Sequence, residues 1–332
     1  MGRDRTGRSA KSQSRACGAR AGQTQERGFR QSNESASNAQ EIGKEITVMD
    51  LSLARRALRG ALDVRRMAQV AISEPICVYD VAAEKLKIEV RFQGGASFGG
   101  MYAKETQTVL VPSERPAGRR AYTCAHELGH WHFDHGTKLE ELSEMDKGDS
   151  DDSDEILANQ FAGHFLMPKW AIEKAFTDRK LNPDSAMAQS FYAIASQFGV
   201  GYTTIVNHMY YSLGLLPARQ FDRLLRSSPK TIKEQLLEQS LPNRLVLVDS
   251  SWNQSVPIDL EVGDGVLCLF SARAENERLL PQSFSGGSLF LAVTPGFSSM
   301  TASDQPRAKR VRISRKGFTG RSIFRHLEDP DA

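Results

Sequence analysis

The chain has 332 residues, of which 40% are hydrophobic and 25% are charged, so it has room for two or three globular domains. No apolar run approaches the roughly 20 residues that span a bilayer, and the N-terminus lacks the apolar core of a signal peptide. The four cysteines have neither disulfide nor metal-ligand spacing. These features exclude a membrane-spanning protein and a disulfide framework, and we expect a cytoplasmic protein.

The first 46 residues are rich in Arg, Ser, Gln, Gly and Ala and show no hydrophobic periodicity. Such a segment cannot bury enough apolar surface to fold by itself, so we expect residues 1–46 to form a disordered basic arm. Its arginines permit weak, nonspecific contact with nucleic acid, but a solvated tail is the simpler interpretation.

A first domain is expected over residues 47–178. Paired glycines separate its early segments and mark turns between them. Hydrophobic periodicity predicts helices at Leu51–Ala71 and Val78–Leu86, strands at Lys87–Phe92 and Thr108–Val111, and an extended stretch near Met101.

A helix is predicted from Ala121 to Gly136, and it contains the pattern H-E-x-x-H at residues 126–130. Residues four apart lie on the same face of a helix, so His126 and His130 can reach one metal ion. Glu127 then lies beside the metal, where it can act as a general base towards water. The alternative interpretation of these five residues is a buried helix with two hydrogen-bonded histidines.

A second helix is predicted at residues 155–168, ends at Pro168 and offers Glu155 as a third ligand. Two histidines and one carboxylate leave the fourth coordination position open, which is the pattern of catalytic zinc sites. Asn159 follows Glu155 by one turn, where its amide could hold that carboxylate or a ligand imidazole. The acidic residues 138–154 between the two helices are expected to form a mobile loop.

The run of residues 119–130, followed by E-x-x-A-N-x-F-A-x-x-F-L-M-P at residues 155–168, resembles the ImmA/IrrE metallopeptidases. Residues 75–92 resemble the helix and first strand that open the domain of this family, so the resemblance spans roughly residues 50–175. In that family the domain is a gluzincin-like zincin that cuts helix-turn-helix repressors and so derepresses phage, mobile-element or stress genes. The site residues that the resemblance implies are the metal ligands His126, His130 and Glu155 and the general base Glu127.

The expected metal is Zn²⁺ by its geometry, and Mn²⁺ is the alternative. In zincins a strand beside the active-site helix pairs with the extended substrate, and either Gly100–Ala103 or Thr108–Val111 could be that strand. Tyr122 lies one turn before His126 and could assist at the oxyanion, although a core tyrosine is the simpler interpretation. We interpret His132 and His135 as neighbours of the site or as structural residues.

Residues 179–240 are expected to form a helical subdomain in which residues 193–209 have a helix-turn-helix cadence. Ala195 is small where the helices would cross, Gly199 would make the turn, and Ile205 would anchor the second helix. The residues of the second helix that could face DNA include no Arg or Lys. They are Thr203, Thr204, Asn207 and His208. Direct DNA binding is therefore possible but not favoured.

Residues 241–332 are expected to form a small β-rich domain, for which substrate docking or regulation is the natural role. Short β-like runs alternate there with Gly, Pro, Asn and Ser turns. These runs are Arg244–Val248, Gly265–Phe270, Ser288–Val293 and Val311–Ile313.

The sequence thus predicts an α+β protein in which a zincin-like metallopeptidase domain precedes a helix-turn-helix-like helical subdomain and a small β-rich C-terminal domain. We expect a zinc-dependent, site-specific metalloendopeptidase with a protein substrate, a basic helix-turn-helix repressor, whose cleavage derepresses stress or mobile-element genes. The alternative is a DNA-binding or antitoxin-type regulator that uses the zincin domain as a structural or sensing module.

Overall fold

A computed structural model describes residues 51–95, 98–141, 152–237, 243–253, 255–302 and 308–327. The predicted basic arm of residues 1–46 lies outside the described residues, and so do residues 142–151 of the predicted acidic loop. From Ser52 onward the chain forms one compact unit. Within the described ranges, no helix has both the length and the apolar character needed to cross a membrane.

The first helix covers residues 51–67. Two residues later, Gln69 adopts a left-handed conformation with φ of 56°. The helix is four residues shorter than the predicted Leu51–Ala71. The buried hydrophobic residues of this segment recur every three or four positions, which gives one apolar face. They are Leu53, Ala57, Ala61, Val64 and Ala68. The predicted helix Val78–Leu86 is one turn of α-helix, α2 (Val78–Asp80), continued by a π-helical turn, η1 (Val81–Lys85).

A five-stranded sheet with the order β13-β1-β3-β2-β4 covers the next part of the fold. Within it β1 and β3 are parallel, and the other neighbours are antiparallel. The strands are β1 (Glu89–Gln93), β2 (Phe98–Ala103), β3 (Thr108–Pro112), β4 (Lys138–Glu141) and β13 (Gly320–Arg321).

Two of these strands differ from the sequence-based expectation. Residues 138–141 were expected at the start of a loop, but their backbone pairs with β2 as β4. Near the other end of the chain, β13 pairs with β1, so the C-terminal region returns to the sheet of the metallopeptidase-like part. Neither pairing has a local sequence signal, because each joins segments that are far apart along the chain.

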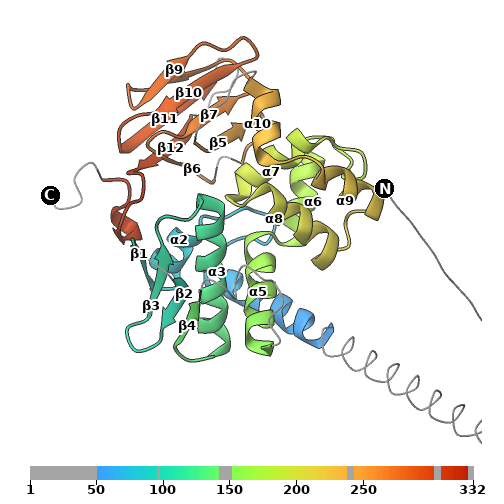
Figure 1. The fold of residues 1–332 in the computed structure, drawn as a ribbon, viewed down its shortest axis with the longest axis vertical. Coiled ribbons are helices and arrows are strands. Elements are labelled where there is room, and N and C mark those ends of the chain that lie inside the picture. The colour runs from blue at the N-terminus through green and yellow to red at the C-terminus, as the bar shows by residue number, and fades with distance from the viewer. Residues whose placement is uncertain are drawn as a thin grey trace, which may run out of the picture. The chain divides into compact units, whose positions relative to one another are not determined.

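Helix α3 (Ala117–Phe133) packs against β2 and β3 of this sheet, and α5 (Ser153–Leu166) lies beside α3 on the side away from the strands (Figure 1). The contact between them is close because Gly129 has no side chain. A Cβ atom at Gly129 would lie 3.0 Å from the Cα of Ala158. Helix α3 ends before the predicted Gly136, because Asp134 adopts the left-handed conformation that closes the helix.

The helical subdomain follows. Its helices are α6 (Lys169–Asp178), α7 (Ala188–Phe198), α8 (Tyr202–Asn207), the π-helical turn η2 (His208–Ser212), α9 (Ala218–Leu225) and α10 (Pro229–Leu237). Gly199 makes the predicted turn between α7 and α8, with φ of 66°. The second helix of the expected helix-turn-helix is short, however, and His208 is buried in η2 rather than available to a DNA groove.

Two four-stranded sheets form the C-terminal part, with the orders β5-β7-β10-β9 and β6-β12-β11-β8. This confirms the prediction of a β-rich C-terminal region. The strands are β5 (Leu245–Val248), β6 (Ile258–Glu261), β7 (Gly265–Cys268), β8 (Ala272–Ala274), β9 (Leu279–Gln282), β10 (Ser288–Ala292), β11 (Gly296–Ala302) and β12 (Lys309–Ser314).

Strand β5 is buried on both faces, and its residues alternate between two cores. Leu245 and Leu247 join the core shared with the helices, whereas Val246 and Val248 join the core between the two C-terminal sheets. The hydroxyl of Tyr192 on α7 also donates a hydrogen bond to the carbonyl of Leu245, at 2.7 Å. The β-rich region is therefore packed onto the helical subdomain through β5.

A buried pair of histidines joins α5 to the helical subdomain. The rings of His164 and His208 are 5.3 Å apart, and Nε2 of His208 donates a hydrogen bond to the carbonyl of Met167 at 3.0 Å. Burial lowers the pKa of His164 to about 4 and that of His208 to about 3. Both rings are therefore neutral at pH 7.

This pair predicts acid sensitivity. Between about pH 6.5 and pH 4 the unfolded chain binds protons at these histidines that the folded chain does not, so the free energy of unfolding should fall as the pH falls. One such histidine accounts for roughly 2 kcal/mol between pH 6.5 and pH 5. Urea unfolding of wild type and His164→Gln at several pH values measures the difference. If the free energy of unfolding changed equally with pH in the two proteins, His164 would not be a neutral buried histidine.

Candidate metal centre

Three side chains from the two packed helices converge on one position. Nε2 of His126 and Nε2 of His130 on α3 are 2.9 Å apart. Glu155 in the first turn of α5 places its carboxylate oxygens 3.2 Å from His126 and 3.4 Å from His130. Both imidazoles are buried, with 1% of their surface exposed, and the three form a group that could hold a metal ion.

Ligand atoms about 2.0–2.2 Å from a tetrahedral ion lie about 3.3–3.6 Å from one another. The distances of 3.2 and 3.4 Å to Glu155 are close to this range, and the 2.9 Å between the two imidazole nitrogens is shorter. Burial raises the pKa of Glu155, but hydrogen bonds from His126 and His130 outweigh it and hold that pKa well below its usual range. The donor set therefore consists of two imidazole nitrogens and one ionised carboxylate, which leaves a fourth position for water or substrate.

Asn159 and Tyr122 support His126 from behind. Oδ1 of Asn159 lies 3.0 Å from Nδ1 of His126, so with a metal bound Nδ1 would donate to Asn159 and leave the Nε2 lone pair for the metal. Of the two partners expected for Asn159, it contacts the imidazole. The hydroxyl of Tyr122 donates a hydrogen bond to the backbone carbonyl of Asn159 at 2.8 Å, and burial raises its pKa to about 12. Tyr122 thus ties α3 to the turn of α5 that carries Asn159.

His130 is supported by His135, one of the two histidines interpreted from the sequence as neighbours of the site or as structural residues. Its Nδ1 lies 2.9 Å from Nδ1 of His135, and Nε2 of His135 lies 3.4 Å from a carboxylate oxygen of Asp154. Asp154 directly precedes Glu155. Helix α5 therefore supplies both a donor atom to the centre and the carboxylate that contacts His135. His132 instead stacks on Phe161, away from the centre.

Glu127 is buried, with 1% exposure, and faces strand β2. A Cβ atom at Gly100 would collide with the Glu127 carboxylate, so only glycine fits there. Of the two strands considered for substrate pairing, β2 is therefore the one that contacts Glu127. Strand β2 is paired on both sides, with β3 and with β4, and the register with β4 shifts between Phe98 and Met101, next to Gly100.

A His-His-Glu donor set with a second, buried glutamate beside it is the arrangement of a metal-dependent hydrolase. Comparison with family models agrees with this class. Residues 83–210 match the IrrE N-terminal-like domain (Peptidase_M78). This part of the chain belongs to the ImmA/IrrE metallopeptidase family.

Among solved structures, the chain is similar to a Mycobacterium tuberculosis transcriptional regulator, with 20% sequence identity and a TM-score of 0.31. The alignment covers 49% of this chain and 46% of that protein, so the chain spans less than half of the length of the structure it matches. A TM-score of this size does not establish a shared fold. A comparison with curated proteins finds no match.

The geometry predicts that Asn159 contributes to metal affinity. Removing a partner that orients a ligand imidazole weakens metal binding about 10–100-fold, and we expect this for Asn159→Ala. Competition with a chromophoric chelator for Zn²⁺ measures the effect. Asn207→Ala, at an exposed position that ends α8, is the control. Equal affinity in all three proteins would show that Asn159 does not orient His126.

Proposed function

We propose that this protein is a metal-dependent, site-specific endopeptidase that cuts a basic helix-turn-helix repressor and so derepresses stress or mobile-element genes. The observation that carries the proposal is that Glu127, which directly follows the donor His126 on α3, is a buried carboxylate beside Gly100 of β2. A burial of this kind is costly, and a purely structural domain has no need of it. Zn²⁺ is the metal that the donor set favours.

A bound metal ion would polarise the scissile carbonyl and acidify the attacking water. Glu127 accepts the proton that this water loses as its oxygen attacks the carbonyl carbon. When the carbon–nitrogen bond breaks, Glu127 passes that proton to the leaving amine. Asn159 and His135 hold the two imidazoles in orientation throughout.

The substrate class follows from charge. The first turn of α5 carries Asp154 and Glu155, with Asp152 as its N-cap. The sequence that precedes it, residues 139–151, is also dense in acidic residues. Asp152 and Asp154, beside the ligand Glu155, favour a basic protein at this end of α5, and repressors that bind DNA are basic.

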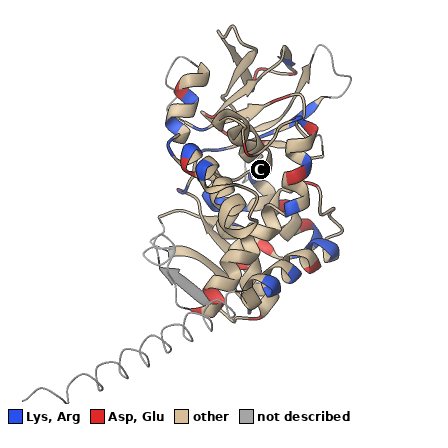
Figure 2. Cartoon of the chain, turned by 90° about the vertical axis from the view of Figure 1, so that its right-hand side faces the viewer, with Lys and Arg blue, Asp and Glu red and all other residues tan. Residues whose placement is uncertain are grey.

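The alternative regulator would have to bind DNA itself. Helix α8 spans Tyr202–Asn207 and contains no Lys or Arg, and its Ile205 and Val206 are buried. From the side shown in Figure 2, basic and acidic residues are interspersed along the described helices. These features support the peptidase over a DNA reader.

Cleavage by wild type and by Glu127→Gln tests the proposal. Both proteins are loaded with Zn²⁺ and incubated with the repressor encoded nearest to the gene, and the products are measured by intact mass. We expect discrete fragments with wild type and a rate at least about 100-fold lower with Glu127→Gln, because the general base is lost.

Equal metal content in the two proteins is the control, since it separates loss of the base from loss of the metal. An intact repressor with both proteins, together with a DNA complex formed by this chain alone, would replace the peptidase with the DNA-binding regulator. Equal cleavage by both would remove Glu127 from the reaction.

A further inference from the structure

Arg120 links the active-site helix to the β-rich C-terminal region. It lies on α3 six residues before His126, and only 6% of its surface is exposed. One guanidinium nitrogen donates to the carbonyl of Ser113 at 3.2 Å, and another lies 2.7 Å from Oε1 of Glu261 on β6. The guanidinium also lies over the ring of Phe92, at 5.6 Å from its centroid.

The N-terminus of α3 packs through Gly118 against the backbone of Val200 and Gly201, but it has no side-chain cap. Its N-cap residue is Pro116, no side chain caps its first amides, and its first turn contains no acidic residue. A negative charge near a helix N-terminus is stabilising, because it complements the helix dipole. Here the carboxylate at this end comes from Glu261, which is 141 positions further along the chain than Arg120.

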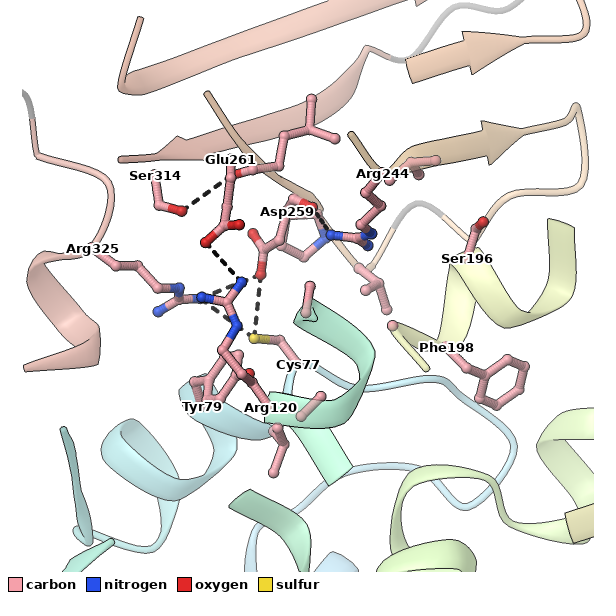
Figure 3. Close-up of a pocket in the computed structure, with 18 of the residues that line it drawn as sticks. Cys77, Tyr79, Arg120, Ser196, Phe198, Arg244, Asp259, Glu261, Ser314 and Arg325 are labelled. Atoms are coloured by element: carbon pink, nitrogen blue, oxygen red, sulfur yellow. Dashed lines mark hydrogen bonds and ion pairs between the residues drawn. The ribbon is translucent and has the colours of Figure 1, made fainter. Parts of the chain in front are cut away.

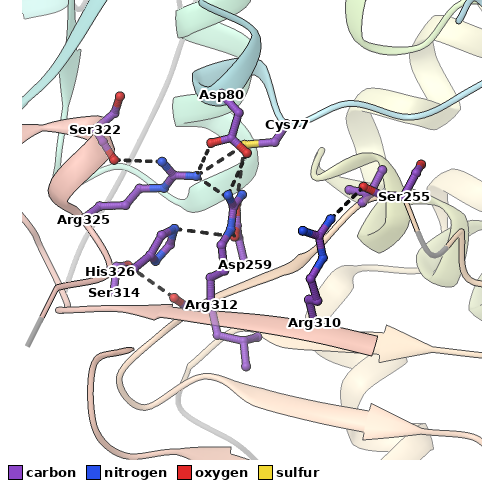
Figure 4. A network of polar contacts seen from close by, with 12 residues as sticks. Cys77, Asp80, Ser255, Asp259, Arg310, Arg312, Ser314, Ser322, Arg325 and His326 are labelled. Atoms are coloured by element: carbon purple, nitrogen blue, oxygen red, sulfur yellow. Dashed lines mark hydrogen bonds and ion pairs between the residues drawn. The ribbon is translucent and has the colours of Figure 1, made fainter. Parts of the chain in front are cut away.

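Glu261 is held in place by a group of ion pairs around Asp259 on the same strand, which we call the anchor. Asp259 and Glu261 are two residues apart on β6, so their side chains leave the same face. Arg312 binds Asp259 through Nε at 2.5 Å and also reaches Asp80 of α2 at 2.7 Å. Arg325 adds contacts to Asp80 at 2.9 Å and to Asp259 at 3.3 Å (Figure 4).

The two arginines favour the ionised form of Asp259. Burial raises the pKa of Asp259, but Arg325 and Arg312 outweigh burial and hold that pKa well below its usual range. The anchor therefore consists of two carboxylates, from α2 and β6, and the guanidinium groups of Arg312 and Arg325. It fixes β6, and with it Glu261, against the metallopeptidase-like part.

The space beside Arg120 is a gap in this joint and too small for an organic ligand. The cavity shown in Figure 3 has a volume of ≈ 90 Å³ and is lined by Arg120, Glu261 and Asp259. A cavity of about 150 Å³ is needed to hold benzene. Water fits, and Nε of Arg120 has no direct hydrogen-bond partner among the described residues. The contact between Arg120 and Glu261 is the polar contact that joins α3 itself to β6, beside the contact of Cys77 with Asp259 at 3.5 Å.

We propose that Arg120 is a positioning residue, through which the β-rich C-terminal region holds α3 at the height that aligns His126 and His130 with Glu155. A displacement of α3 along its axis would move both imidazoles relative to α5 at once. The consequence for the rate of peptide cleavage rests on the proposed function, whereas the consequence for the metal centre does not.

The variants Glu261→Gln and Glu261→Ala test this role. Gln keeps an acceptor for Arg120 without the charge, and Ala removes both. Each protein is loaded with Co²⁺, whose visible absorption reports the geometry of its ligands, and its metal affinity is measured by chelator competition. We expect a changed Co²⁺ spectrum and an affinity about 10-fold lower, with the larger change in the Ala variant. The value of kcat should fall about 10-fold while KM stays unchanged.

Glu275→Gln is the matched control, because Glu275 is an exposed glutamate of the same region. A Co²⁺ spectrum and an affinity identical to wild type in folded Glu261→Gln would overturn the proposal, whether or not the Ala variant folds. If the spectrum responds but wild type cleaves no repressor, the positioning role stands and the peptidase proposal fails.

Discussion

The close contact between α3 and α5 is the constraint on which the metal centre depends. Because Gly129 lies directly over Ala158, the two helices approach closely enough for imidazoles from one and a carboxylate from the other to share one position. The same contact brings Asn159 behind His126 and Tyr122 against the backbone of α5. A larger residue at Gly129 would separate donor atoms and supporting contacts together.

The spacing of residues close together in the sequence predicts which of them share a helix face. It does not predict which distant segments contact one another. The spacing of His126 and His130 fixes their common face on any helix, and the helical pattern from Glu155 to Pro168 indicates a partner of matching length. The helix ends were less accurate, since Asp134 closes α3 before the expected glycine. The roles of these residues as ligands and base are still predictions.

The features that the sequence did not reveal depend on tertiary contacts. The pairing of β13 with β1 and the ion pair between Arg120 and Glu261 join segments that no local periodicity relates. The poor DNA-reading surface was visible in the composition of α8, but the burial of His208 required the π-helical turn and its contact with Met167. The C-terminal region is therefore part of the same packed structure, because β13 adds a strand to the first sheet and Glu261 contacts α3.

Strand β4 has a consequence for how a peptide reaches Glu127. Zincin substrates bind as an extended strand, and the edge of β2 beside Gly100 is already paired with residues 138–141 of the same chain. A peptide that takes this edge must first separate β4 from it. Since β4 is only four residues long, this exchange costs few hydrogen bonds, and a longer segment gains more than it displaces. Under the proposed function, a peptide substrate would compete with β4 for one edge, and short or poorly pairing peptides would lose this competition.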